Sequence, residues 1–221
     1  MKAMILAAGR GKRMGTLTEE LPKPLLSVGE ESLIERHVRC LAEAGIDEIV
    51  INLSHLGQRI RSRLGDGQRW NLHISYSDEG ATPLETAGGI VQALALLGSE
   101  PFLLINADTF TDFDFARLKI IDGQGTLVMV SNPPHNPSGD FGIDAESRLT
   151  DAAPKLTFAG ISLLAADLFA HLQPGPRALK PIFDASIARG GLHGLRYDGL
   201  WMDIGTPERL YQAQALVGHA T

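Results

Sequence analysis

Cysteine is nearly absent from this chain, and its scarcity excludes two kinds of protein. Cys40 is the only cysteine among 221 residues, so neither a disulfide framework nor a multi-thiolate metal site is possible within the chain. Long hydrophobic runs are also missing. The apolar run after Lys2 has six residues, too few for a secretory leader or a membrane span. We therefore expect a cytoplasmic protein without a membrane partner.

Basic residues are outnumbered by acidic ones, 20 Lys and Arg against 26 Asp and Glu, for a net charge of -6. This balance argues against nucleic acid as the main partner, because binding to phosphate backbones usually needs a basic surface. The hydrophobic fraction of 44% and the charged fraction of 21% are typical of a globular protein with a sizeable core. Without repeats or linkers, residues 1–221 are expected to form a single domain, as a monomer or a homodimer.

Strand and helix patterns alternate along most of the chain. This order predicts an α/β, Rossmann-like fold: a mainly parallel mixed sheet with helices on both faces. The helix at 32–45 starts with a capping box, Ser32 and Glu35, and Gly45 suits its C-cap. Pro207 suits the first turn of a terminal helix. Strands are expected at 2–7, 48–53, 72–77, 101–108, 126–131, 156–165 and 192–198, and helices at 32–45, 56–67, 88–98 and 179–191.

The segment LAAGRGKRM, residues 6–14, follows the first expected strand. Ligands of open α/β sheets bind beyond the carboxyl ends of the strands, so this loop is a candidate site. Gly9 and Gly11 would let backbone amides approach an anion, and Arg10, Lys12 and Arg13 add positive charge. Neither the Walker pattern nor the dinucleotide fingerprint is complete here. By itself, the segment is equally compatible with an ordinary surface turn.

Lys23 stands between two prolines in PKPLL, residues 22–26. Prolines fix the backbone, so they would aim the ammonium group with little loss of entropy. The alternative is a solvated lysine in a proline turn.

Together these two segments resemble the signature of the sugar-1-phosphate nucleotidyltransferases, the nucleotide-sugar pyrophosphorylases. Three later segments agree with that family in type and order: PLETAGG at 83–89, NAD at 106–108 and WMDIGTPE at 201–208. The resemblance extends over nearly the whole chain. It implies the family's nucleotide-diphospho-sugar transferase fold and a reaction in which a sugar 1-phosphate and a nucleoside triphosphate form a nucleotide sugar and pyrophosphate.

The resemblance also implies roles for individual residues. Two residues would be catalytic: Arg13 at the β- and γ-phosphates that leave as pyrophosphate, and Lys23 at the α-phosphoryl group that is transferred. Asp108 and Asp203 would share one Mg²⁺. The absence of a convincing Ser-His-Asp arrangement is expected, since the attacking phosphate is already ionised. The nucleotide would be bound by Ala8, Gly9, Gly11, Lys12, Arg13, Lys23, Glu79 and Gly88, and the base or sugar by Glu85, Thr86, Asn106, Gly139 and Thr157.

The choice of substrate within the family rests on finer details. PLETAGGI, NADTFTDFDFARL and LTFAGIS are most similar to short members acting on UTP and N-acetylmuramic acid 1-phosphate in cell-wall (peptidoglycan) recycling, and small residues near Ala159 and Gly160 would leave room for that bulky sugar. Mannose-, glucose- or heptose 1-phosphate with another nucleotide is the alternative, as is a non-catalytic regulator that binds nucleotide sugars.

Three departures from the family pattern qualify this resemblance. Gly15 and Thr16 stand where many relatives have a bulkier residue and a proline, and Glu85 stands where relatives often have glycine. Many relatives also carry a second lysine in a Glu-Lys-Pro element, where this chain has TDAAPK; either Lys155 replaces that lysine from a shifted position or the role is absent. The histidines at 37, 55, 73 and 135 lack paired metal-ligand spacing and are interpreted as helix-surface, loop or strand residues.

Overall fold

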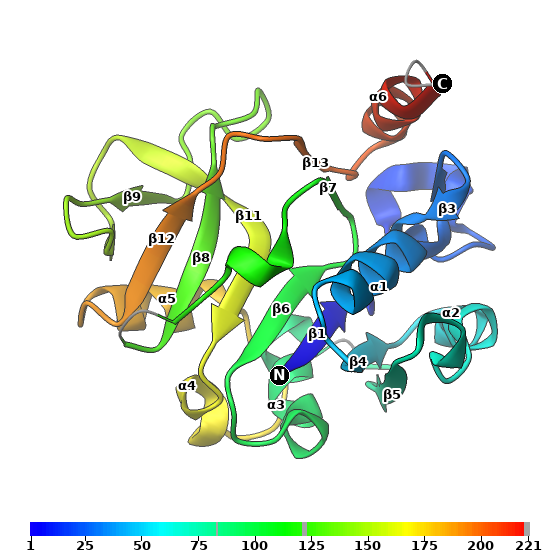
Figure 1. Ribbon diagram of the computed structural model, residues 1–221, viewed down its shortest axis with the longest axis horizontal. Coiled ribbons are helices and arrows are strands. Elements are labelled where there is room, and N and C mark those ends of the chain that lie inside the picture. Colours follow the sequence, from blue (N-terminus) through cyan, green and yellow to red (C-terminus); the bar gives the residue numbers. More distant parts are fainter. Residues whose placement is uncertain (83, 121–122, 219–221) are drawn as a thin grey trace.

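A mixed β-sheet forms the centre of the protein (Figure 1). The computed structural model describes residues 1–82, 84–120 and 123–218. Within them, nine strands pair in one sheet, in the order β10-β9-β11-β6-β1-β4-β5, with β8 beside β11 and β12 beside β8. The strands of this sheet are β1 (Lys2–Leu6), β4 (Glu48–Leu53), β5 (His73–Asp78), β6 (Phe102–Asn106), β8 (Gly125–Val130), β9 (Phe141–Ile143), β10 (Leu149–Thr150), β11 (Lys155–Leu164) and β12 (Leu192–Arg196).

The half of the sheet that contains the chain's first strand is parallel. β1 pairs in parallel with β4 on one side and with β6 on the other, and β5 extends the parallel set beyond β4. β11 then runs antiparallel to β6. The chain therefore changes direction across the sheet at β1, which creates a crevice at the carboxyl ends of β1 and its neighbours. The predicted α/β fold class is confirmed.

Helices cover both faces of this sheet. They are α1 (Leu33–Glu43), α2 (Gly57–Leu64), α3 (Glu85–Leu97), α4 (Asp167–Ala170), α5 (Lys180–Ile187) and α6 (Pro207–Gly218). Side chains of β1 alternate between the two cores, as expected for a strand buried on both faces. Ile5 packs with α1 and α2, while Met4 packs with α3, α4 and α5. None of the described helices has the length and apolar character that a membrane crossing requires.

A third, smaller core closes the carboxyl end of the sheet. Two short strand pairs lie here, β2 (Ser27–Val28) with β3 (Glu31–Ser32) and β7 (Thr109–Thr111) with β13 (Trp201–Asp203). Met14, Phe110 and Leu210 are buried together in this cluster. In Figure 1, the C-terminal helix α6 accordingly lies beside the β2–β3 segment, and Gln214 donates a hydrogen bond to the Ser27 carbonyl at 2.9 Å. The final helix thus packs against the segment that follows the glycine loop.

The capping box predicted at the start of α1 is present. The Ser32 hydroxyl accepts from the Glu35 amide, and the Glu35 carboxylate accepts in return from the Ser32 amide. The same carboxylate pairs with Arg63 of α2 at 2.9 Å and with Arg69 at 2.6 Å. Burial raises the pKa of Glu35, but these hydrogen bonds outweigh burial and lower it to about 2. Glu35 therefore joins α1 to the following helical segments.

His37 corrects one expectation from the sequence. It was interpreted as a helix-surface residue, but it is 2% exposed and packs near Phe115. Position 37 follows Leu33 and Ile34 by one helical turn, so it falls on the same inward face. Burial lowers the pKa of His37, whereas its hydrogen bond with the Thr109 backbone raises it. Burial has the larger effect, and the pKa falls to about 4. The imidazole is neutral and lies beneath β7.

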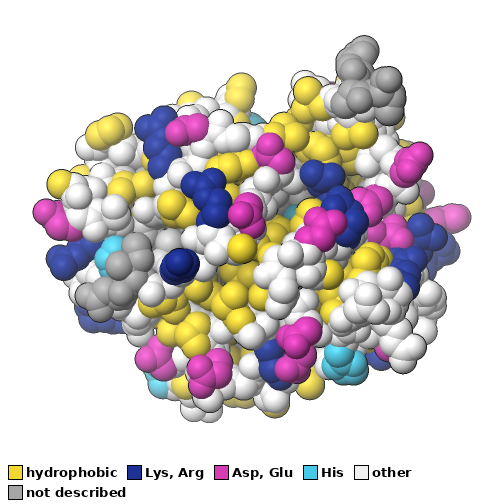
Figure 2. All heavy atoms as spheres, viewed as in Figure 1, with side chains coloured by type: hydrophobic (Ala, Val, Ile, Leu, Met, Phe, Trp, Pro, Cys, Tyr) yellow, Lys and Arg dark blue, Asp and Glu magenta, His cyan; other side chains and the backbone are white. Residues whose placement is uncertain are grey.

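Strands also occur where the sequence indicated a turn-rich loop. The expected loop at 132–142 ends in β9, which pairs with β11 and β10. These short strands form a small antiparallel extension beyond β11, which separates them from the parallel half. The face in Figure 2 carries Lys and Arg side chains interspersed with Asp and Glu, rather than gathered in one basic area.

Candidate active site

The glycine loop turns sharply at Gly11 as it leaves β1. Gly11 has φ +62, and a Cβ atom at this position would lie 3.1 Å from Thr18 Cγ2 and 3.2 Å from Lys23 Cβ. Both the left-handed backbone and the tight space favour glycine. The short 3₁₀ helix η1 (Lys12–Thr18) follows, and the buried Met14 anchors it. Lys12 and Arg13 therefore leave an anchored turn on the solvent side.

Lys23 is positioned by the two prolines beside it. Pro22 and Pro24 are buried, and the 3₁₀ helix η2 (Lys23–Leu25) closes with a hydrogen bond from the Leu25 amide to the Pro22 carbonyl at 2.8 Å. The Lys23 side chain is 12% exposed, and its Nζ forms an ion pair with Asp108 Oδ2. The proline frame thus directs the ammonium toward the carboxyl end of β6.

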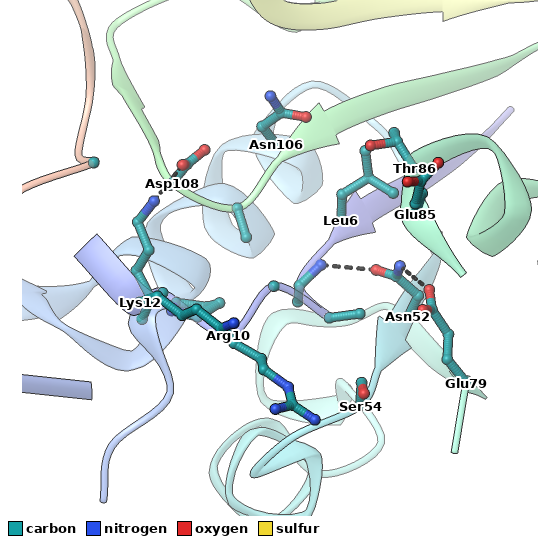
Figure 3. A pocket seen from close by; sticks show the side chains of 18 of the residues that line it. Leu6, Arg10, Lys12, Asn52, Ser54, Glu79, Glu85, Thr86, Asn106 and Asp108 are labelled. Carbon is teal, nitrogen blue, oxygen red and sulfur yellow. Dashed lines mark hydrogen bonds and ion pairs between the residues drawn. The ribbon is translucent and has the colours of Figure 1, made fainter. Parts of the chain in front are cut away.

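A cavity of about 460 Å³ lies at the carboxyl ends of β1, β4, β5 and β6, and Figure 3 shows its side chains. Arg10, Lys12 and Arg13 line it, and none of the three forms an ion pair within the described part of the chain. Three cations without counter-ions at a glycine turn form a strong local attraction for an anion. A polyphosphate would suit these cations and the nearby backbone amides together.

Asn52 supports the start of the glycine loop from the neighbouring strand. Its Oδ1 accepts a hydrogen bond from the Ala7 amide at 2.7 Å, and its Nδ2 donates to Glu79 Oε1 at 2.6 Å (Figure 3). Glu79 also accepts from the Leu84 amide at 3.3 Å. A Cβ atom at Gly89 would lie 2.4 Å from Glu79 Oε1, so the glycine makes space for this carboxylate. The network connects the loop after β1, strand β4 and the segment between β5 and α3 on one side of the cavity.

Asp108 and Asp203 lie on adjacent backbone segments. Thr109 pairs with Asp203 in the β7–β13 register, and the Ile204 amide donates to the Asp108 carbonyl at 2.8 Å. The Asp203 carboxylate pairs with Arg209 and lies 3.0 Å from His135 Nε2. Long-range pairing has therefore brought together two acids that are far apart in sequence.

This acidic pair is suited to a hard divalent cation. Mg²⁺ prefers oxygen ligands and is commonly held by one or two carboxylates together with substrate phosphates. No cluster of three or more His, Cys, Asp or Glu side chains able to hold a metal occurs in residues 1–82, 84–120 and 123–218. Asp108 and Asp203 could provide the two carboxylates, and phosphate oxygens in the adjoining cavity would complete the ligand set. The donor chemistry fits the ion.

A second cavity, of about 470 Å³, adjoins the first. Glu85, Thr86 and Asn106 line both cavities, so the two spaces meet at these residues. Aromatic side chains form much of the far wall, with Phe158 and Phe183 in edge-to-face contact at 5.7 Å between ring centroids. A polar, cationic space beside an apolar one accommodates a ligand with a charged end and a ring-shaped body.

The family model described as Nucleotidyl transferase matches residues 2–153. The chain belongs to the nucleotidyl transferase family. A curated relative from Neisseria meningitidis, an N-acetylmuramate alpha-1-phosphate uridylyltransferase, is 45% identical to this nucleotidyl transferase over 99% of both chains. A catalytic subunit beta of mannose-1-phosphate guanylyltransferase from Dictyostelium discoideum is 30% identical over 98% of this chain and 64% of its own length.

The fold of this nucleotidyl transferase also agrees with solved structures. HddC from Yersinia pseudotuberculosis superposes with a TM-score of 0.83 and 21% sequence identity, covering 98% of this chain and 99% of the other. Agreement over whole chains at such low identity demonstrates a common architecture.

Most residues predicted for the site gather around the first cavity of the nucleotidyl transferase. The lining includes the predicted residues Ala8, Gly9, Gly11, Lys12, Arg13, Lys23, Glu79, Glu85, Thr86, Asn106 and Asp108. Asp203 does not itself line the cavity, but Gly205, two residues later, does. Pro83 of the PLETAGG segment lies outside the described residues.

Three predicted binding residues lie away from the lining of both cavities. Gly88 is buried in α3, where a Cβ atom would lie 2.4 Å from the Gly175 carbonyl oxygen. Gly139 has φ +64, and the Thr157 hydroxyl donates to Asn132 at 2.9 Å. Lys155 pairs with Asp151 at 2.5 Å and is likewise absent from the described lining. In the structure, the contacts of these three residues and of Lys155 are with neighbouring parts of the chain.

The space expected near Ala159 and Gly160 is not there. Ala159 is 1% exposed, and a Cβ atom at Gly160 would lie 2.5 Å from Asn106 Nδ2. The Asn106 side chain lies against Gly160 and fills this space. The open volume lies instead beside the aromatic residues of the second cavity.

Reasoning from the sequence missed Asn52, Arg209 and His135. Asn52 is a polar residue 3% exposed near the end of a buried strand, a combination that often marks a specific hydrogen-bond role. Arg209 follows the WMDIGTPE segment by one residue, whereas His135 has no local signal. Only the folded chain places His135 beside Asp203.

Proposed function

We propose that this protein transfers uridylate from UTP to N-acetylmuramic acid 1-phosphate, forming UDP-N-acetylmuramic acid and pyrophosphate. The observation that carries the proposal is the 45% identity to the Neisseria uridylyltransferase over 99% of both chains. Arg10, Lys12 and Arg13, which line the first cavity and form no ion pair with any residue that the structure describes, support it, because this reaction brings two anions together.

In this reaction, an oxygen of the sugar phosphate attacks the α-phosphorus of UTP. A new phosphorus–oxygen bond forms, the bond to the bridging α–β oxygen breaks, and pyrophosphate leaves. The attacking phosphate is already an anion, so no side chain needs to remove a proton. Charge repulsion and orientation are the main obstacles, and fixed cations and amides reduce both.

The proposed catalytic cations are Lys23 and Arg13. Lys23 points to the end of β6 and would neutralise the α-phosphoryl group and the sugar phosphate as they approach. Arg13 lies at the edge of the cavity, near Gly205, and would offset the charge on the departing pyrophosphate. Amides near Ala8, Gly9 and Gly11, together with Lys12, would hold the triphosphate. Met14 and the two prolines beside Lys23 are buried, so the turns that carry these cations are anchored in the core.

Asp108 and Asp203 would hold the Mg²⁺ of the reaction. When bound, the ion would neutralise phosphate charge and act as a Lewis acid at the transferring group. Asp108 pairs with Lys23 and Asp203 with Arg209, so each carboxylate has a cationic neighbour. Asp108 lines the first cavity, and Asp203 stands two residues before Gly205, which also lines it.

The remaining predicted residues are assigned to the uridine and the sugar. Glu79 and Gly88 would shape the base side through the Asn52 network and the start of α3. Glu85, Thr86 and Asn106 lie where the cavities meet and would contact the ribose or the sugar. Gly139 and Thr157 would contact the sugar from outside the lining of the two cavities. Supplied with UTP inside the cell, such an enzyme would work in the cytoplasm, as a monomer or a homodimer.

A substrate panel tests the proposal. Purified protein is incubated with Mg²⁺, each of four nucleoside triphosphates and a set of sugar 1-phosphates, and pyrophosphate release is measured. We expect the highest kcat/KM for UTP with N-acetylmuramic acid 1-phosphate. Turnover of other sugars but not this one would reject the assignment.

Mannose 1-phosphate with GTP is the second candidate, favoured by the 30% identity to the guanylyltransferase subunit. The same panel decides between the two. Asp108→Asn tests the third possibility, a regulator without turnover. If neither the parent protein nor this variant releases pyrophosphate from any substrate pair, catalysis is the wrong interpretation.

A further inference from the structure

The second cavity carries an uneven set of charges. Glu85 and Asp140 are acidic, and Lys180 is the only Lys or Arg among the described residues that line it. Asp140 already accepts hydrogen bonds from the Phe158 amide at 2.8 Å and from Asn136 at 3.3 Å. Any additional carboxylate that enters this space would meet two acids, so it needs a cation beside it.

Lys180 is placed to provide that cation. It is the first residue of α5, and its Nζ lies 5.3 Å from the centroid of the Phe141 ring, in the wall of the cavity. The segment before α5 is held against the start of α3, because the Arg177 amide donates to the Leu84 carbonyl at 2.9 Å. The backbone that carries Lys180 is therefore connected to the Glu85 side of the same cavity.

The present partner of Lys180 can be exchanged. Its ammonium pairs with Asp184 at 2.8 Å, one turn along the same helix, and the two side chains are 63% and 48% exposed. Exposed pairs of this kind contribute little stability. The flexible four-carbon stem allows the ammonium to move from Asp184 to a ligand at the rim without a change in the backbone.

We propose that Lys180 is a specificity-determining residue that binds the carboxylate of the sugar's lactyl ether. This inference rests on the proposed function, since N-acetylmuramic acid 1-phosphate carries that carboxylate whereas mannose, glucose and heptose 1-phosphates do not. The aromatic wall of Phe141, Phe158 and Phe183 would receive the apolar face of the sugar, with Lys180 at the edge where the lactyl group extends.

Lys180→Met tests this assignment by comparing two sugars that differ only in the lactyl ether. The variant keeps the length of the side chain but lacks the charge. For N-acetylmuramic acid 1-phosphate, we expect KM to rise about 10-fold, the scale of one charge-assisted hydrogen bond at a partly exposed site. The KM for UTP and the kcat should stay near the parent values. N-acetylglucosamine 1-phosphate is measured as a substrate or as a competitive inhibitor. Its KM or its inhibition constant should be the same for the parent and the variant.

Two further variants serve as controls. Lys180→Arg keeps the charge and should restore most of the affinity. Lys2→Met removes another lysine that forms an ion pair, here with Glu48 at 2.9 Å, at the opposite end of β1 from the cavities, and it should change neither sugar constant.

The outcomes separate this inference from the function on which it rests. If the parent protein uses N-acetylmuramic acid 1-phosphate but Lys180→Met leaves its KM unchanged, Lys180 does not bind the carboxylate. An equal loss for both sugars would also overturn the inference, since it would indicate a general effect on the cavity. If the parent protein never accepts this sugar, the proposed function itself fails.

Discussion

The neutral, buried state of His37 makes the stability of the fold sensitive to mild acid. Its pKa is lowered to about 4 from an ordinary value of 6.5, with burial as the main cause. The unfolded chain therefore binds a proton at a pH where the folded chain does not. Stability that is present above pH 6.5 is lost as the pH falls toward 4. The full difference corresponds to about 3 kcal/mol.

Between pH 7.5 and pH 5.0, the contribution of His37 amounts to about 2 kcal/mol of that loss. Glu35 changes little in this interval, because its pKa is lowered to about 2, so its contribution is lost only between about pH 4.5 and pH 2. Urea denaturation at the two pH values gives the change in free energy of unfolding for the parent protein and for His37→Gln. The variant can keep a hydrogen bond to the Thr109 backbone but has no proton to bind.

We expect the parent protein to lose about 2 kcal/mol more than His37→Gln over this interval. The control is His73→Gln, which removes an exposed histidine from β5 and should behave like the parent. Equal pH dependence in the parent and His37→Gln would refute the reasoning, because it would mean that the imidazole can be protonated in the folded state at no cost.

Three other predictions concern the cavities. Lys23→Ala should lower kcat for pyrophosphate release by about 10²-fold, the scale for one fixed electrostatic donor, and an unchanged rate would make Lys23 a structural residue. Gly11→Ala places an alanine in the left-handed region, with its Cβ 3.1 Å from Thr18 Cγ2. The melting temperature should fall and the KM for the nucleotide should rise. Equal nucleotide affinities of the parent and the variant in calorimetric titration would contradict this. Glu85 has φ +58, so Glu85→Gly should stabilise the fold by about 1 kcal/mol while it lowers kcat/KM for the sugar phosphate. Glu85→Gln, which retains the strained backbone, is the matched control, and a glycine variant without any gain in stability would argue against strain at this position.

The local elements of this protein could be read from its sequence, because their signals are short in range. The strand predicted at 48–53 is found at Glu48–Leu53, and the capping box of Ser32 and Glu35 begins α1 as expected. Hydrophobic periodicity and capping depend on residues within one or two turns of each other. The glycine turn at Gly11 and the proline frame of Lys23 are local features of the same kind.

Site residues followed from the sequence where they stand at the ends of parallel strands. The loop after β1 and Asp108 after β6 meet at one edge because parallel neighbours place their carboxyl ends together. Motif order then supplied the roles proposed for these residues. Their positions around the first cavity agree with those roles, whereas Gly88, Gly139 and Thr157 lie outside its lining.

Contacts between distant segments were decided only by the tertiary structure. The β7–β13 pairing places Asp203 beside Asp108, and His135 reaches Asp203 from the segment after β8. The open space lies by Phe158 rather than by Gly160. His37 shares the inward face of α1 with Leu33 and Ile34, but the burial that keeps its imidazole neutral comes from the elements packed over that face. The sequence by itself determined which segments became strands, helices and anchored turns, because those preferences act within a few residues. Which of these elements pack together determines the cavities, the acidic pair and the exposure of each charged side chain. This packing depends on the apolar burial and the strand pairing of the whole chain, which no short segment decides.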